Sequence, residues 1–341
     1  MGPRAVLLAV LTLALAAGCT GGQAPGPAPG PVRGPVQSSV RPTQAVQPDR
    51  TVNVGVPGSY QVVKHEQMFT EPARDRTGAR VLVTWLRYPV VTRPGRGFPV
   101  LLFAPGFGQC GPPYSDLLQS WASAGYIVVT VNFPRTDCDA AAAGKADEAD
   151  LVNQPADMRY VLTGLLALNA RPESWLAGLI DPDRIAAAGH SDGGDTVVAL
   201  AGNSCCADHR LRAVAVLAGA EWPPMPGRYF AGPGTPPPMM FVQGSADGIN
   251  QPECSRLLYQ ADVAGTRYYL DLPGADHELP YWGTNPVEQK VAQVTLEFFD
   301  RYVLGQSSAL AEMTRDGNVA GSAALVSGGE LPPLTGAATC T

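Results

Sequence analysis

A short glycine-rich segment carries a candidate nucleophile. Residues 189–194 read Gly-His-Ser-Asp-Gly-Gly, with Ser191 at the third position. An apolar run at 184–188 precedes the segment and a helix-capable run at 195–201 follows it. A serine held in a sharp turn between a strand and a helix presents its hydroxyl above the sheet, and flanking glycines permit the tight backbone. Such a serine can attack a carbonyl carbon.

An acid and a base follow two later predicted strands. Asp247 comes shortly after the apolar run 239–242, and His277 comes after the run 268–272. The carboxyl ends of parallel strands gather at one edge of a sheet, so we expect both side chains near Ser191. In this reading Ser191 is the nucleophile, His277 the general base and Asp247 the group that orients the imidazole.

The choice of base is narrow because the chain has four histidines. His65 lies in the β-rich N-terminal region, His190 lies inside the turn and faces the wrong way, and His209 follows the helix after Ser191. Only His277 lies in a loop that follows a strand beyond the acid. For the acid, Asp247 is preferred to Asp271, which should lie within a strand, and to Asp276, which adjoins the base.

The tetrahedral intermediate formed by such a serine needs backbone N–H donors for its oxyanion. The N–H of Asp192, next to the nucleophile, is one candidate. The loop 104–109 after the apolar run 98–103 should supply the other, and the sequence points to the N–H of Phe107.

The same loop permits a rival reading. Gly106, Gly108 and Gly111 fit the G-x-G-x-x-G pattern of dinucleotide-binding loops. Pro112 and Pro113 stand where free N–H groups should meet a pyrophosphate, and no acid ends the next strand. An oxidoreductase is therefore the third hypothesis, and we expect no nucleotide cofactor.

Composition bounds the class of protein. The chain has 341 residues, 45% of them hydrophobic, which is enough for a sizeable core. Its formal net charge of −6 gives no basic excess, so nothing in it favours a nucleic-acid partner. The sequence does not indicate an oligomeric state.

The N-terminus predicts export. An apolar stretch, 5–17, follows Arg4 and precedes Gly18 and Cys19, as in a signal peptide over 1–18. Residues 15–19, Leu-Ala-Ala-Gly-Cys, resemble a bacterial lipobox, which implies a diacylated Cys19 and a membrane anchor outside the cell. The alternative is plain secretion. Residues 19–50, rich in Gly and Pro, predict a flexible spacer.

Six cysteines follow Cys19, and an even count in an exported chain favours disulfides. Six cysteines allow 15 pairings, and the sequence alone does not select one. Cys110 and Cys138 both follow predicted strands and form a plausible pair. The adjacent Cys205 and Cys206 favour two separate bridges, and their spacing fits no zinc pattern, so no metal is expected.

From about residue 50, β-rich runs alternate with helical ones, which predicts an α/β fold. We expect a catalytic domain over 51–306 and a C-terminal tail over 307–341 that Cys340 could fasten. Strands are expected at 51–63, 79–91, 98–103, 126–131, 184–188, 213–218, 239–242 and 268–272. Helices are expected at 114–124, 155–168, 195–201, 252–263 and 286–304.

With these motifs in hand, residues 58–305 resemble the α/β-hydrolase superfamily. The matching segments are 104–108, 189–194, 244–247 and 274–277. Within the superfamily the chain looks like the bacterial polyester hydrolase, cutinase-like and dienelactone hydrolase-related group. The resemblance implies a mostly parallel sheet with helices on both faces. The segment between 217 and 239 departs from the group, because it is short and rich in proline, and it predicts an exposed cleft without a large lid domain.

The resemblance also implies function. It predicts an exported serine hydrolase that cleaves carboxylic esters through an acyl-enzyme without a cofactor, with esters of lipids and polyesters among the candidate substrates. Phe107 and Trp222 occupy places where that group flanks its substrate with aromatic rings, and Asp192 stands where the group commonly has Met. An amidase, a thioesterase or a non-catalytic ligand-binding protein of the same fold is the alternative.

Overall fold

The computed structural model describes residues 57–72, 78–90, 95, 97–331 and 340. The predicted signal peptide, the lipidation site at Cys19 and the spacer 19–50 lie outside these residues. Among the described residues, no helix has the length and apolar character needed to cross a membrane.

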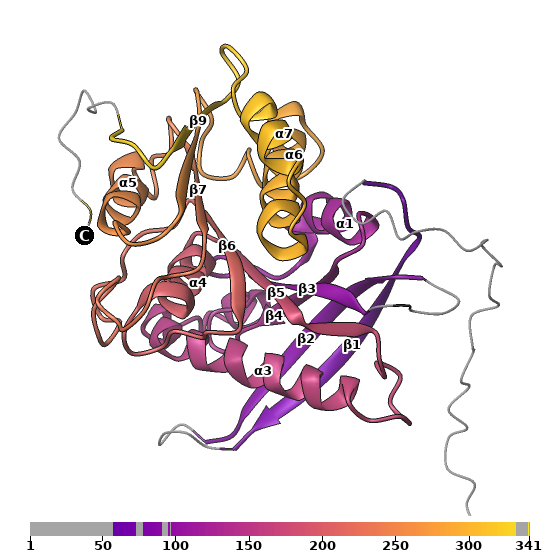
Figure 1. The fold of residues 1–341 in the computed structure, drawn as a ribbon. Coiled ribbons are helices and arrows are strands. Elements are labelled where there is room, and N and C mark those ends of the chain that lie inside the picture. The colour runs from indigo at the N-terminus through magenta and orange to yellow at the C-terminus, as the bar shows by residue number, and fades with distance from the viewer. Residues whose placement is uncertain (1–56, 73–77, 91–94, 96, 332–339, 341) are drawn as a thin grey trace, which may run out of the picture. The chain divides into compact units, whose positions relative to one another are not determined.

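One sheet of nine strands organises the described part of the chain (Figure 1). Its order is β1-β2-β4-β3-β5-β6-β7-β8-β9. Neighbouring strands from β4 to β8 are parallel, whereas β1, β2 and β9 pair antiparallel at the two sides. The strands are β1 (Val62–Glu71), β2 (Arg80–Pro89), β3 (Phe98–Ala104), β4 (Ile127–Asn132), β5 (Ile180–His190), β6 (Leu211–Leu217), β7 (Met239–Gly244), β8 (Arg267–Leu272) and β9 (Ala324–Ser327).

Helices cover both faces of this sheet. The α-helices are α1 (Ser115–Ser123), α2 (Cys138–Ala142), α3 (Gln154–Asn169), α4 (Asp192–Gly202), α5 (Pro252–Ala261), α6 (Pro286–Phe299) and α7 (Ala309–Asp316). Short helical segments are η1 (Pro112–Tyr114), η2 (Glu148–Asn153) and η3 (Asp300–Leu304). Helices α1 and α6 pack on one face, and α3, α4 and α5 pack on the other. This is the α/β-hydrolase arrangement that the sequence predicts.

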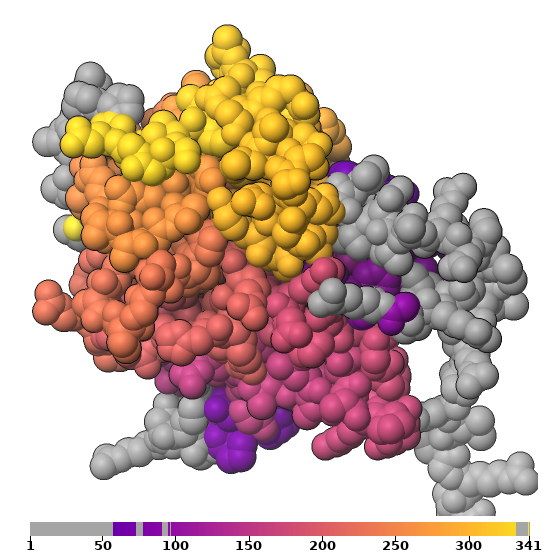
Figure 2. Space-filling model, viewed as in Figure 1, coloured from indigo at the N-terminus to yellow at the C-terminus, as the bar shows by residue number. Residues whose placement is uncertain are grey.

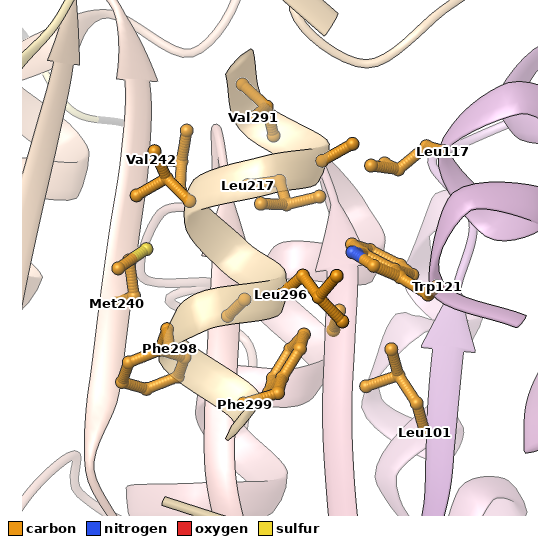
Figure 3. Packing of buried hydrophobic residues seen from close by; sticks show 14 of the residues in the cluster. Leu101, Leu117, Trp121, Leu217, Met240, Val242, Val291, Leu296, Phe298 and Phe299 are labelled. Carbon is orange, nitrogen blue, oxygen red and sulfur yellow. The ribbon is translucent and has the colours of Figure 1, made fainter. Parts of the chain in front are cut away.

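The core on the α6 face shows why the central strands read as continuous apolar runs. Trp121 of α1 and Phe299 of α6 meet edge to face above the sheet, with ring centroids 5.9 Å apart (Figure 3). The indole N–H of Trp121 donates to the hydroxyl of Thr295 at 3.1 Å, so its one polar atom is satisfied. Strands covered on both faces need apolar side chains on both sides of the pleat.

The structure shifts several predicted elements. The antiparallel start is confirmed, with β1 at Val62–Glu71. Of the expected strand 51–63, residues 57–61 form no strand, and 51–56 lie outside the described residues. The acidic connection 137–150 contains a short helix, α2, which Asp137 caps by accepting from the N–H of Ala140. The tail beyond 306 forms α7 and then β9, which pairs with β8. Its segments lie beside those of β7, β8 and α5 on the face drawn in Figure 2.

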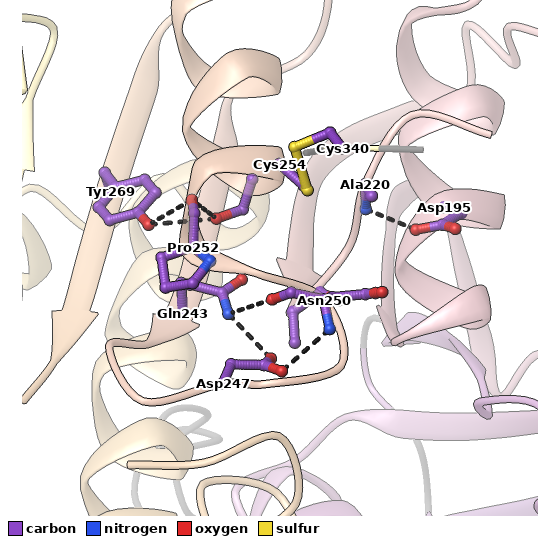
Figure 4. Close-up of a disulfide and its surroundings, with 11 residues drawn as sticks. Asp195, Ala220, Gln243, Asp247, Asn250, Pro252, Cys254, Tyr269 and Cys340 are labelled. Atoms are coloured by element: carbon purple, nitrogen blue, oxygen red, sulfur yellow. Dashed lines mark hydrogen bonds between the residues drawn. A yellow bond between two sulfur atoms is a disulfide. The ribbon is translucent and has the colours of Figure 1, made fainter. Parts of the chain in front are cut away.

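The disulfides correct one expectation. Cys110 is bonded to Cys138, as predicted. Cys205 is bonded to its neighbour Cys206, so the prediction of two separate bridges at this pair is wrong. The remaining bond joins Cys254 to Cys340 and fastens the tail to α5 (Figure 4). Disulfides of this number indicate an exported or extracellular protein.

The segment 218–238 between β6 and β7 contains turns and bends and no helix. This segment therefore contains no amphipathic helix that could form a lid over the carboxyl ends of the strands. The carboxyl ends of β3, β5, β7 and β8 are followed by the loops that carry the predicted site residues.

Candidate active site

Ser191 lies in a strained turn between β5 and α4. Its backbone has φ 56° and ψ −124°, in a region that residues with a Cβ rarely adopt. Among the described residues other than glycine, only Ala218 and Phe230 also have positive φ. A strained residue persists where the surrounding structure over-determines it, and such residues cluster at active sites.

Close backbone contacts hold this turn. A Cβ on Gly189 would lie 2.0 Å from the carbonyl oxygen of Gly193, and one on Gly193 would lie 1.9 Å from that of Ala104. No side chain fits into either space. The two glycines of the motif are therefore required by packing, as the sequence reading proposed for the turn.

The loop after β3 lies against Ser191. A Cβ on Gly106 would lie 3.2 Å from the Cβ of Ser191. The next residue, Phe107, donates its N–H to no protein acceptor among the described residues. The N–H of Asp192, at the first position of α4, belongs to the helix turn that has no intrahelical acceptors. Both predicted oxyanion donors thus lie on segments adjacent to Ser191.

Asp247 and His277 come together as predicted from their places after β7 and β8. The Nδ1 of His277 lies 2.8 Å from Oδ2 of Asp247, and both side chains are buried. Asp247 also accepts from the side chain of Gln243 and from the backbone N–H groups of Ile249 and Asn250 (Figure 4). With a carboxylate as acceptor, Nδ1 carries the proton and Nε2 keeps its lone pair.

The structure gives no hydrogen bond between Ser191 Oγ and His277. The link between their loops is His190, whose Nε2 lies 2.8 Å from the backbone oxygen of His277.

The ring of His190 connects three loops. Burial lowers its pKa to about 3, so the ring is neutral. The carbonyl of His277 can only accept, and Nε2 must therefore carry the proton. Nδ1 then accepts from the hydroxyl of Tyr114 at 2.9 Å, and that hydroxyl accepts from the N–H of Gly106 at 3.1 Å. A continuous chain of hydrogen bonds therefore links the loop of Gly106, through Tyr114 and His190, to the loop of His277.

Sequence reasoning excluded His190 as the base, and its two engaged nitrogens agree with that. It missed Tyr114, because nothing in the spacing of a tyrosine at the end of η1 marks it as a partner of residue 190. The remaining histidines lie elsewhere: His65 stacks on Trp175, with ring centroids 3.9 Å apart, and His209 follows α4.

The side chain of Asp192 is a second titratable group beside the nucleophile. Burial raises its pKa to about 7, and the negative charge of Glu148 adds to the shift. Its Oδ2 has no hydrogen-bond partner among the described residues. Near neutral pH this carboxyl is therefore divided between the neutral and the charged form.

Trp222 follows β6 in the segment that should rim the site. Its ring is partly buried against a small apolar cluster with Met225 and Leu151, and its indole N–H has no partner among the described residues. Asp195 of α4 holds the start of this segment, because its carboxyl accepts from the N–H of Ala220 at 2.6 Å. Burial raises the pKa of Asp195 well above its ordinary value.

No group of three or more His, Cys, Asp or Glu side chains in the described part of the chain could hold a metal ion. The vicinal cysteines that raised the question are joined to each other.

Residues 65–222 match the model of the Chlorophyllase family. The matched part runs from β1 through Ser191 to Trp222 and leaves Asp247 and His277 beyond it. The match supports an ester hydrolase of the α/β-hydrolase type, but not the polyester hydrolase and dienelactone hydrolase-related group of the sequence resemblance. A search of curated proteins gave no match.

Replacing Tyr114 with Phe removes the hydroxyl that joins Gly106 to His190 and leaves the ring. The loops of Gly106 and His277 then lose the hydrogen-bond chain that links them through His190. If these loops carry the predicted oxyanion donor and base, kcat for an ester should fall by about 10- to 100-fold while KM changes little. Steady-state kinetics with active-site titration measures this. Tyr259→Phe, which removes the buried hydroxyl that donates to Gly329, is the matched control and should keep kcat. An unchanged kcat in Tyr114→Phe would contradict the role.

The pKa of Asp192 predicts a pH dependence. Because the pKa is raised from 3.8 to about 7, the carboxyl is neutral below pH 7 and negative above it. A negative charge beside the oxyanion opposes the transition state by about 1 kcal/mol, or about fivefold. The kcat/KM of Asp192→Asn, divided by that of the wild type, should rise by this factor between pH 6 and pH 8.5. A ratio that stays flat with pH would contradict the assignment.

Proposed function

We propose that the chain hydrolyses carboxylic esters with Ser191 as nucleophile, His277 as general base and Asp247 as the group that orients the base. The observation that carries the proposal is the buried Asp247–His277 pair on loops next to a strained serine. The Chlorophyllase match independently favours ester hydrolysis.

In the acylation step, Nε2 of His277 takes the proton of Ser191 Oγ as the oxygen attacks the ester carbonyl carbon. Asp247 holds Nδ1–H and stabilises the imidazolium that forms. The N–H groups of Phe107 and Asp192 donate hydrogen bonds to the carbonyl oxygen as negative charge develops on it. Each such donor stabilises the transition state by about 3–4 kcal/mol.

The tetrahedral intermediate collapses when His277 returns the proton to the leaving alcohol, which leaves an acyl group on Ser191. A water molecule then attacks the acyl carbon, and His277 takes its proton. His277 then returns this proton to Ser191 Oγ as the bond between Oγ and the acyl carbon breaks, which releases the carboxylic acid and restores the serine. The chain's own residues supply every proton transfer in this sequence.

Aromatic side chains near Ser191 favour ester substrates with apolar groups. Phe107 is 40% exposed beside the nucleophile, and Trp222 lies on the other predicted wall. A turn-rich segment without a helix forms this part of the rim, so esters of differing size could enter, lipid and polyester chains included. We further propose that a lipid on Cys19 anchors the exported enzyme to a membrane, with 19–50 as spacer.

The test is hydrolysis of p-nitrophenyl esters from acetyl to palmitoyl by wild type and Ser191→Ala. We expect turnover by the wild type and a loss of at least about 10⁴-fold in kcat in the variant, because the nucleophile is removed. Ser308→Ala is the matched control, since the hydroxyl of Ser308 caps no helix N–H. Equal activity in Ser191→Ala would show that another group is the nucleophile.

The same assay separates the alternatives. Faster cleavage of p-nitroanilides or thioesters than of esters would favour an amidase or thioesterase that uses the same three residues. Saturable ester binding without turnover by folded wild type would favour a binding protein on this fold and contradict the proposed function.

A further inference from the structure

Arg87 on β2 is a buried cation without a counter-charge. Its side chain is 5% exposed, and no carboxylate of the described residues lies within 4.0 Å of its nitrogens. Within the described part of the chain its Nε has no hydrogen-bond partner, and the guanidinium donates one long hydrogen bond of 3.5 Å to the hydroxyl of Ser115. Burying a charge without a partner costs several kcal/mol, so this arrangement requires an explanation.

Arg80 on the same strand is also buried, but carboxylates compensate its charge. It is equally buried, and its guanidinium donates four hydrogen bonds to Asp150 and Asp157. Burial alone would lower the pKa of Arg80, but these carboxylates raise it above the ordinary value. Burial lowers the pKa of Arg87, and no partner opposes the shift. Arg80 is thus paired with two carboxylates, whereas Arg87 is paired with no carboxylate of the described residues.

Arg87 lines a cavity of about 470 Å³ that strands β1 and β2 form together with η1 and the first residues of α1 and α2. The walls near it are apolar: Val83, Trp85, Leu86, Pro112 and the disulfide of Cys110 and Cys138. Asn132, at the end of β4, also lines the cavity, and its Oδ1 has no partner among the described residues. An apolar pocket with a few convergent polar groups is the usual form of a small-molecule site.

The other charges around the cavity restrict the ligand. Glu66, Asp139 and Lys64 are exposed to solvent, and one oxygen of Asp137 accepts from the N–H of Ala140. These carboxylates outnumber the single lysine, so a dianion such as phosphate is disfavoured at the entrance. A carboxylate can take two parallel hydrogen bonds from one guanidinium, and an alkyl or aromatic body would lie along Trp85.

We propose that this cavity binds a monocarboxylate with an apolar body, its carboxylate on Arg87. The site is separate from Ser191 and does not depend on the proposed function, although such acids are also what ester hydrolysis releases. Cys110 forms one wall of the cavity and directly follows the loop of Phe107, so a ligand there contacts the segment that leads into the active site.

Octanoate is the probe, and calorimetry together with thermal unfolding of the full chain is the measurement. We expect saturable binding of octanoate by wild type and Ser191→Ala alike, and no binding of the neutral octanamide or of inorganic phosphate. Arg87→Met keeps the apolar stem and removes the charge, so octanoate affinity should fall at least about tenfold. Arg210→Met, which removes a surface arginine paired with Asp208, is the matched control and should bind normally.

Arg87→Met should fold as well as the wild type or better, because an unpaired buried charge is removed. Should it fail to fold, Trp85→Ala, at an exposed wall position, must weaken octanoate binding instead. Octanoate binding that Arg87→Met leaves intact would overturn the site, and so would the absence of binding by folded wild type. Equal binding of phosphate would overturn the ligand class.

Discussion

The backbone contacts around residues 189–193 constrain the rest of the candidate site. The carbonyl of Ala104 at the end of β3 and that of Gly193 in the first turn of α4 occupy the places where side chains would otherwise stand. Helix α4 therefore starts directly against two strand ends. This close approach forces Ser191 into its unusual backbone conformation, and it brings Gly106 and the N–H groups of the first helical turn next to the serine.

Around this fixed turn, hydrogen bonds define the positions of the more distant groups. In the loop 245–251 after β7, backbone N–H groups donate to the carboxylate of Asp247, and the side chain of Gln243 in β7 donates to its other oxygen, which also receives His277. The backbone of His277 is in turn held by His190. A buried network of this kind is satisfied only in one arrangement, so it specifies the geometry as well as stabilising it.

Much of this fold could be predicted from the sequence. Strands buried on both faces appear as continuous apolar runs, and glycine or proline residues mark many of the turns between them. The order of Ser191, Asp247 and His277 after successive strands predicted which loops meet, and the Asp247–His277 bond agrees; the catalytic roles stay predictions. Some expectations failed because they depended on contacts remote in sequence: β9 is a four-residue strand that exists because β8 offers it an edge. The prediction for Cys205 and Cys206 failed for another reason, since their bond joins neighbours in the sequence and a count of cysteines does not distinguish it from two separate bridges. Tyr114 gains its importance only from where η1 places it, directly before α1.

The central claim is that Ser191 is activated by His277 and Asp247, and reaction with an organophosphate tests it without knowledge of the natural substrate. Diethyl p-nitrophenyl phosphate would be added to wild type and to His277→Gln, and the labelled peptide identified by mass spectrometry after digestion. The account predicts one adduct, on Ser191, and a labelling rate at least about 100-fold slower in the variant. An adduct on another residue, or equal rates in the two proteins, would contradict it.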